Sequence, residues 1–207
     1  MAISKRSPGR PRRSELRMPT HDAIIIAASR CFMEHGYKGV SMEMVASQAG
    51  ITKAAIYYHF PDKPALVIAV SDWIFSRATT QTSALLASQD PLKVRLERVA
   101  ESFFHIPDPF VRFALMMGEA SADLTPEQLA TIRRHQDRIG QLLTSTFSAA
   151  VQEGECSSSD PLFLAHAFIA LLHLGSSVDF EGNKLFPDPH STACSLVDLF
   201  WNGMGSS

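Results

Sequence analysis

Long apolar runs are missing from this chain of 207 residues. A membrane-crossing helix needs about 18 or more consecutive apolar residues. The best stretch, Pro161 to Leu174, is shorter and is interrupted by His166 and His173. The N-terminus carries positive charge without the apolar segment of a secretory signal. We therefore expect a cytoplasmic protein without a membrane partner.

Cysteine pairs and enzyme motifs are also missing. Cys31, Cys156 and Cys194 lie far apart and show no Cys-x-x-Cys spacing, which predicts neither a disulfide framework nor a zinc site. His166 and His173 lie two helical turns apart, about 10 Å, which is too far for one metal ion. The chain has no Gly-x-Ser-x-Gly, His-Glu-x-x-His, phosphate-loop or dinucleotide motif. We expect no metal, no cofactor and no enzyme activity.

Charge is divided unevenly along the chain. Residues 1–63 hold 10 Lys/Arg against 5 Asp/Glu, whereas residues 64–207 hold 9 against 16. This asymmetry indicates that the N-terminal end meets a polyanion. Six basic residues fall within the first seventeen, among Pro8, Gly9 and Pro11, and such a segment cannot build a core. Residues 1–18 are therefore predicted to form a flexible basic arm.

Beyond the arm, the periodicity predicts an all-α protein of about nine helices, since strand-like alternation and hairpin turns are lacking. Caps and breakers mark the ends of these helices. The expected helices run from near 20 to 36, 41 to 50, 52 to 59, 64 onward, 91 to 105, 110 to 121, 126 to 153, 161 to 177 and 191 to 203.

Residues 40–60 have the layout of a helix-turn-helix. The small Ala46 and Ala49 allow two helices to cross closely, and Gly50 provides the left-handed turn. Ile56 anchors the second helix to the first. At about 100° per residue, Lys53, Ala54, Tyr57 and Tyr58 share an arc that points away from Ile56. This arc is predicted to face the major groove of DNA.

The stretch 23–70 also resembles a known family. The matching features are Ala27-Ala28, Phe32, Gly36-Tyr37, Ser41-Met42, Val45-Ala46, Ala49-Gly50-Ile51-Thr52-Lys53, Ile56-Tyr57-Tyr58-His59-Phe60, Lys63 and Leu66. With these features the chain resembles the N-terminal domain of the TetR family of transcriptional regulators. The resemblance implies a dimeric repressor that binds an inverted-repeat operator in double-stranded DNA and is released by a small molecule. One alternative is a regulator that activates or that acts without a small ligand. The other is a helical small-molecule-binding or enzymatic protein with an inactive DNA-binding head.

The resemblance also implies roles for individual residues. Its recognition surface corresponds to Lys53, Ala54, Ala55 and Tyr57, and its phosphate contacts correspond to Ser41, Tyr57, His59 and Lys63. Thr52 either joins this surface or only caps the third helix. Glu43 departs from the family, in which a basic or neutral polar residue is common here. Its carboxylate either accepts from cytosine N4 or turns away from the phosphates.

The basic arm allows two interpretations. Arg10, Arg12 and Arg13 stand in a Gly/Pro frame that fits a narrow A/T-rich minor groove. The other interpretation is a solvated tail that adds only non-specific attraction.

The predicted organisation is an arm (1–18), a helix-turn-helix head (19–63) and a larger helical body for ligand binding and dimerisation (64–207). Aromatic and Met side chains in the body predict a largely apolar effector. The expected ligand residues are Phe103, Phe104, Phe113, Met116, Met117, Phe147 and His166. The expected homodimer interface comprises Leu162, Phe163, Phe168, Ile169, Leu172, Leu196, Leu199, Phe200 and Trp201.

Overall fold

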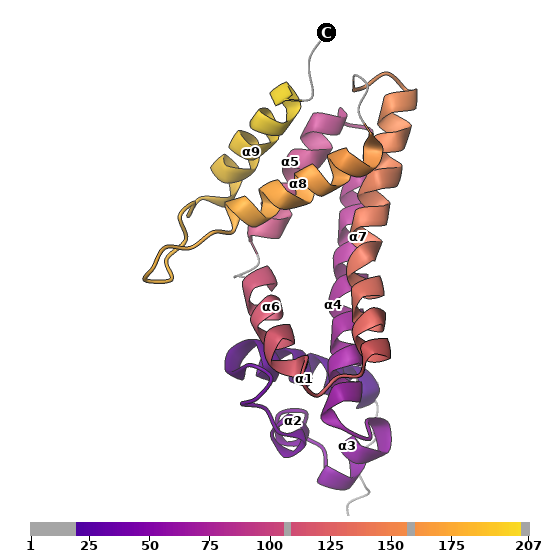
Figure 1. Ribbon diagram of the computed structural model, residues 1–207, viewed down its shortest axis with the longest axis vertical. Helices are drawn as coiled ribbons and strands as arrows, with labels where there is room; N and C mark the ends of the chain where they lie inside the picture. The colour runs from indigo at the N-terminus through magenta and orange to yellow at the C-terminus, as the bar shows by residue number, and fades with distance from the viewer. Residues whose placement is uncertain (1–19, 106–108, 157–159, 204–207) are drawn as a thin grey trace, which may run out of the picture.

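The computed structural model describes residues 20–105, 109–156 and 160–203. The described residues form nine α-helices and no strand, which confirms the predicted all-α fold (Figure 1). Their bounds are α1 Thr20–His35, α2 Met42–Gln48, α3 Lys53–His59, α4 Lys63–Leu86, α5 Leu92–Phe104, α6 Pro109–Ala120, α7 Pro126–Gln152, α8 Pro161–Gly175 and α9 Pro189–Gly203.

Local chemistry accounts for most of these boundaries. Asp62 caps α4, Thr125 caps α7 and Asp160 caps α8, each through a side-chain oxygen that accepts a backbone N–H. Thr125 and Gln128 form a full capping box. Gly36 follows α1 with a φ of 69°, a left-handed conformation that suits glycine. The expected boundaries are accordingly confirmed to within about two residues at most helix ends.

The helices pack around two hydrophobic cores. The first joins α1, α2, α3 and the start of α4 to α6 and the start of α7. The second joins the end of α4 to α5, the later part of α7, α8 and α9. The long helices α4 and α7 lie side by side and connect the two ends of the molecule (Figure 1). Helix α4 therefore contributes side chains to both cores.

A hairpin-like connection links α8 to α9 and projects from the body (Figure 1). An antiparallel bridge pairs Val178 with Lys184, and the carboxylate of Asp179 accepts N–H groups from Glu181 and Asn183. Phe180 is fully exposed at this turn. Among the described residues, no helix is long and apolar enough to cross a membrane.

Candidate nucleic-acid interface

The first helix of the helix-turn-helix is held by its cap and by buried side chains. Ser41 Oγ accepts the backbone N–H of Met44 at 3.1 Å. Val45 and Ala46 face the core, so the side chains on the other side of α2 are left at the surface. Gly50 then adopts a φ of 66° and turns the chain toward α3. The predicted turn is confirmed.

The second helix, α3, is positioned in the same way. Thr52 Oγ1 accepts the backbone N–H of Ala55 at 3.2 Å, so the predicted capping role of Thr52 is confirmed. Ile56 is fully buried and Phe60 nearly so, which fixes the rotation of α3 on the head. A capping hydroxyl that accepts a hydrogen bond still has its own O–H to donate. Ser41 and Thr52 therefore remain able to donate to a phosphate.

The predicted arc of α3 lies at the surface at one end of the molecule. Lys53 and Ala54 are exposed, Tyr57 keeps 41% of its surface and Tyr58 keeps 86%. Ala55 is half-buried. Two tyrosines this open in a packed head are unusual for side chains of their size, because each leaves a large apolar ring in water. Their hydroxyls can donate to phosphate oxygens.

Lys53 does not stand alone in this surface. Its Nζ lies 2.5 Å from Glu43 Oε1 and 5.9 Å from the centre of the Tyr57 ring. The hydrogen bond from Lys53 lowers the pKa of Glu43 below its ordinary value, and the same bond raises the pKa of Lys53. Glu43 therefore pairs with a cation on α3. Both sequence interpretations of its carboxylate, acceptance from cytosine N4 and avoidance of the phosphates, stay predictions. In the sequence this contact is visible only as an acid, Glu43, and a base, Lys53, ten positions apart. The turn between α2 and α3 brings the two side chains together.

Lys63 is used inside the protein. Its ammonium donates to the carbonyl oxygens of Tyr37 and Val40, at 2.9 and 3.0 Å, and lies 4.1 Å from the centre of the Tyr37 ring. An ammonium has three N–H donors, so one remains for a phosphate. The sequence predicted a phosphate contact here and missed the structural role, because these carbonyls belong to a turn more than 20 residues earlier.

His59 is half-buried at the end of α3. Its ring lies 5.3 Å from the Tyr58 ring and 6.1 Å from the His21 ring, which in turn stacks on Phe60 at 5.1 Å. A phosphate contact by His59 stays a prediction. The arm residues Arg10, Arg12 and Arg13 lie outside the described residues, and their role stays a prediction as well.

The predicted ligand residues are divided between the two cores. Phe113 and Met116 are buried in the first core, with Met117 packed against it. Phe104 and Phe147 are buried in the second core, with Phe103 packed against it. His166 is exposed on α8. The structure therefore does not bring the seven residues together around one cavity.

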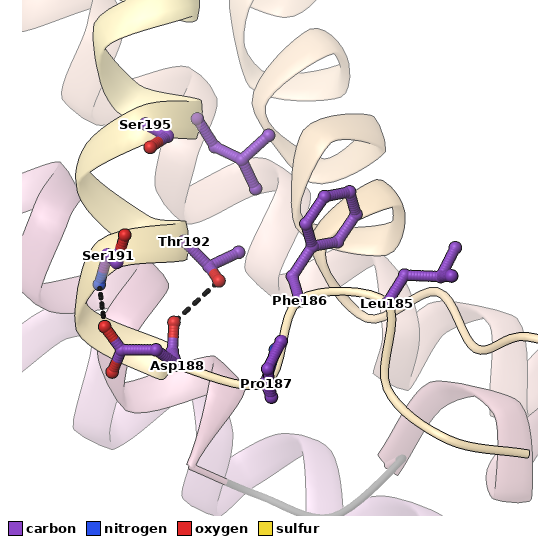
Figure 2. Close-up of a pocket in the computed structure, with 8 residues that line it drawn as sticks. Leu185, Phe186, Pro187, Asp188, Ser191, Thr192 and Ser195 are labelled. Carbon is purple, nitrogen blue, oxygen red and sulfur yellow. Dashed lines mark hydrogen bonds between the residues drawn. The ribbon is translucent and has the colours of Figure 1, made fainter.

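A cavity of about 270 Å³ lies elsewhere, between the end of the α8–α9 connection and the start of α9. Figure 2 shows Phe186 and Pro187 next to the first turns of α9, whereas the Leu185 side chain points away from that helix. Asp188 also lines this cavity: its carboxylate accepts the backbone N–H of Ser191, and its carbonyl accepts the Thr192 hydroxyl (Figure 2). None of the seven predicted ligand residues lines this cavity.

The predicted dimer residues fall into two groups. Leu162, Phe163 and Leu199 keep 53%, 68% and 61% of their surface exposed, as an unpartnered interface would. The others belong to the protomer's own second core or pack against it: Phe168, Ile169, Leu172, Leu196, Phe200 and Trp201. The three exposed residues come from α8 and α9, which pack against each other.

Residues 24–70 match a family described as "Bacterial regulatory proteins, tetR family". The HTH-type transcriptional regulator CymR of Pseudomonas putida is 31% identical over 136 residues, which are 64% of this chain and 65% of CymR. The chain therefore spans somewhat less than two thirds of that relative.

Solved structures share the whole fold. A proposed TetR-family transcriptional regulator of Mesorhizobium loti superposes with a TM-score of 0.75 at 22% identity, over 90% of this chain and 97% of that one. AibR, solved in complex with isovaleryl coenzyme A and operator DNA, superposes with a TM-score of 0.66 at 22% identity, over 88% and 98%. Similarity in the head thus extends to the arrangement of the body helices.

Proposed function

The chain belongs to the tetR family of bacterial regulatory proteins, and from this premise we propose that it is a DNA-binding transcriptional regulator, a repressor released by a small molecule. The observation that carries the proposal is the exposed arc of α3, with Lys53, Ala54, Tyr57 and Tyr58 in solvent above the buried Ile56. A helix presented in this way fits the major groove of DNA. A protein that acts on an operator works in the cytoplasm.

In this proposal the roles on DNA follow from the reach of each side chain. Lys53 and the small Ala54 and Ala55 meet base edges, while Tyr57 and the hydroxyls of Ser41 and Thr52 hold the phosphate backbone. Tyr58, His59 and the free N–H of Lys63 add further backbone contacts. The arm (1–18) extends the contact beyond the head (19–63).

The body (64–207) supplies the dimer. Large apolar side chains are exposed on α8 and α9, namely those of Leu162, Phe163 and Leu199. In this proposal a second copy of the chain covers them across a twofold axis. Two heads related by such an axis bind an inverted repeat whose half-sites lie about one helical turn, or a multiple of it, apart.

The body also supplies ligand control. AibR was solved with both an acyl coenzyme A and operator DNA, which supports a small effector with an apolar part for this chain as well. We place the effector between the two cores, beside Ile139, which packs against both of them. Its binding shifts the protein toward a state in which α4 holds the two heads at the wrong separation for the operator. The size of the effect equals the difference in affinity of the effector for the two states.

An electrophoretic mobility shift assay with the DNA that flanks the protein's own gene tests the proposal. We expect a retarded complex. Unlabelled DNA of the same sequence should displace the labelled DNA from it, and a scrambled duplex of equal length should not. Tyr57→Phe and Tyr58→Phe variants, which keep the rings and lose the hydroxyls, report the phosphate contacts. Equal affinity for specific and scrambled DNA in the intact protein would favour the alternative, a helical ligand-binding protein with an inactive head.

A further inference from the structure

Glu43 and Lys53 form an ion pair across the turn of the helix-turn-helix. Glu43 lies in the first turn of α2 and Lys53 is the first residue of α3, and Lys53 Nζ lies 2.5 Å from Glu43 Oε1. The Glu43 side chain keeps 49% of its surface exposed and that of Lys53 keeps 66%. The pair is thus open to a partner on the side that faces solvent.

The backbone beneath both side chains is held in place. Ser41 caps α2 next to Glu43, and Thr52 caps α3 next to Lys53. The buried Val45 and Ile56 fix how the two helices rotate on the head. The two side chains therefore meet on helices whose starts are capped and whose rotation is fixed by buried anchors.

The paired groups still have hydrogen-bonding capacity. The Lys53 ammonium has three N–H donors and gives one to Glu43, which leaves two. The second carboxylate oxygen of Glu43 can accept from another donor. The pair therefore presents donors beside an acceptor, in a fixed order along the surface of the head.

A G·C base pair carries the complementary pattern in the major groove. Guanine offers the acceptors O6 and N7, and the paired cytosine offers the N4 donor directly beside them. An A·T pair offers a donor at adenine N6 and an acceptor at thymine O4. Lys53 and Glu43 together match the G·C pattern and would face like groups on an A·T pair with adenine in place of guanine. A reversed T·A pair offers O4 and N6 in the matching order, but it places the thymine methyl group where guanine offers N7, so Lys53 loses one acceptor.

A phosphate is the weaker partner for the pair. The charges of Glu43 and Lys53 cancel, so the pair as a unit gains little from the negative potential of the backbone. A carboxylate close to a phosphate is repelled. A base edge, in contrast, uses both the donors and the acceptor.

We propose that the Glu43–Lys53 pair acts as one specificity element that reads a single G·C base pair in each half-site, with Lys53 donating to guanine and Glu43 accepting from cytosine N4. This assignment rests on the proposed DNA-binding function. Glu43 is then a specificity-determining residue. The order of the acid on α2 and the base on α3 decides which DNA strand carries the guanine.

Selection of sequences from a random duplex library, with the full-length protein at fixed salt, tests the assignment. The wild-type protein is expected to enrich sites in which one position of each half-site is G·C. Replacing that pair by A·T, with adenine in place of guanine, should lower affinity about tenfold or more, in line with a bidentate contact. Glu43→Met, which removes the acceptor, and Lys53→Met should each reduce this discrimination to about twofold or less. Glu34→Met, at an exposed carboxylate on α1, is the matched control and should leave it unchanged.

The exchanged variant Glu43→Lys/Lys53→Glu gives the most specific test, because it keeps an ion pair but reverses the positions of donor and acceptor. We expect it to prefer the guanine on the opposite strand at the same position. If the G·C preference persists in all three variants, or if they change affinity for every sequence equally, the inference is overturned while the proposed function stands. If the wild-type protein enriches no sequence at all, the proposed function itself fails.

Discussion

The carboxylate of Glu119, near the end of α6, accepts the backbone N–H of Lys38 at 2.9 Å, although 81 positions separate the two residues. Lys38 belongs to the turn between α1 and α2, whereas Glu119 lies on α6, whose buried side chains join the same first core. A Cβ at Gly36 would come within 2.9 Å of the same carboxylate, so Glu119 lies directly over this turn. The contact therefore ties the head to α6.

Removing this tie should loosen the head. Glu119→Ala is expected to lower the free energy of unfolding by about 1 kcal/mol, because the N–H of Lys38 loses its protein partner. Glu119→Gln keeps an acceptor oxygen and should recover most of the loss. Chemical denaturation followed by circular dichroism measures both. An Ala variant as stable as the wild type would show that water replaces the carboxylate without cost.

Lys63→Met should destabilise the protein as well as weaken DNA binding. The ammonium satisfies two carbonyl oxygens of the Tyr37–Val40 turn, and charge-assisted bonds of this kind are worth about 2 kcal/mol in total when partly buried. Lys38→Met, at an exposed lysine of the same turn, is the matched control and should leave stability unchanged. Denaturant midpoints decide this, and identical midpoints for the two variants would contradict a structural role for Lys63.

His135 predicts a dependence of stability on pH. Burial lowers its pKa, against the opposing effect of Asp72, whose Oδ1 lies 3.7 Å from His135 Nε2. Arg138 and Arg134 lower the pKa further. In the unfolded chain His135 therefore takes up a proton near pH 6.5, whereas in the folded protein it takes up the proton only at a lower pH. The contribution of neutral His135 to the free energy of unfolding is fully present above about pH 6.5. It is lost as the pH falls toward the lower pKa that His135 has in the folded protein.

His135→Gln should therefore reduce the loss of stability on acidification from about pH 7.5 to about pH 5.5. His35→Gln, at an exposed histidine on α1, serves as the control. Thermal unfolding at several pH values measures the slope for each protein. The assignment fails if wild type and His135→Gln lose stability in parallel.

The exposed face of α8 and α9 predicts an assembly mutant. Phe163→Glu/Leu199→Glu places charges on two side chains that are 68% and 61% exposed in the protomer. Because neither residue belongs to the protomer's core, the variant should stay folded and become monomeric. Phe180→Glu, on the projecting connection, should remain a dimer. Sedimentation at micromolar concentration distinguishes these outcomes, and a dimeric double variant would move the interface elsewhere.

Deleting residues 1–17 tests the two interpretations of the arm. The deletion removes six positive charges and one negative charge per chain, so affinity for DNA should fall at low salt. A solvated tail predicts equal losses for operators with A/T and G/C flanks, whereas minor-groove insertion predicts the larger loss with A/T flanks. Binding measured with both flanks decides, and an unchanged affinity would reject both interpretations.

Most of the local structure could be predicted from the sequence. Ser41 and Thr52 are short polar residues directly before apolar periodicity, and Gly36 and Gly50 are placed where helices must end. Such signals act within a few residues, through a side-chain oxygen and a nearby N–H or through a left-handed φ. The arc of Lys53, Ala54, Tyr57 and Tyr58 follows from the same helical geometry once Ile56 is recognised as the buried residue.

The predicted ligand site fared differently. Phe113 and Phe147 are equally apolar in the sequence, and both are buried, yet they lie in different cores. Burial follows from hydrophobicity, which each residue carries by itself. Which side chains surround a buried residue depends on the angles at which α4, α6 and α7 pack against one another. The amino-acid composition does not determine these angles.

The sequence by itself determined the helices, their caps and the exposed face of α3, because these depend on contacts between residues only a few positions apart. Only the tertiary structure decided that Lys63 serves the turn at Tyr37 and Val40, that Glu119 reaches Lys38, and that Glu43 pairs with Lys53. Each of these contacts joins groups from different elements over distances of a few ångströms. Such proximity arises only when whole helices pack, since packing sets the position of every side chain at once.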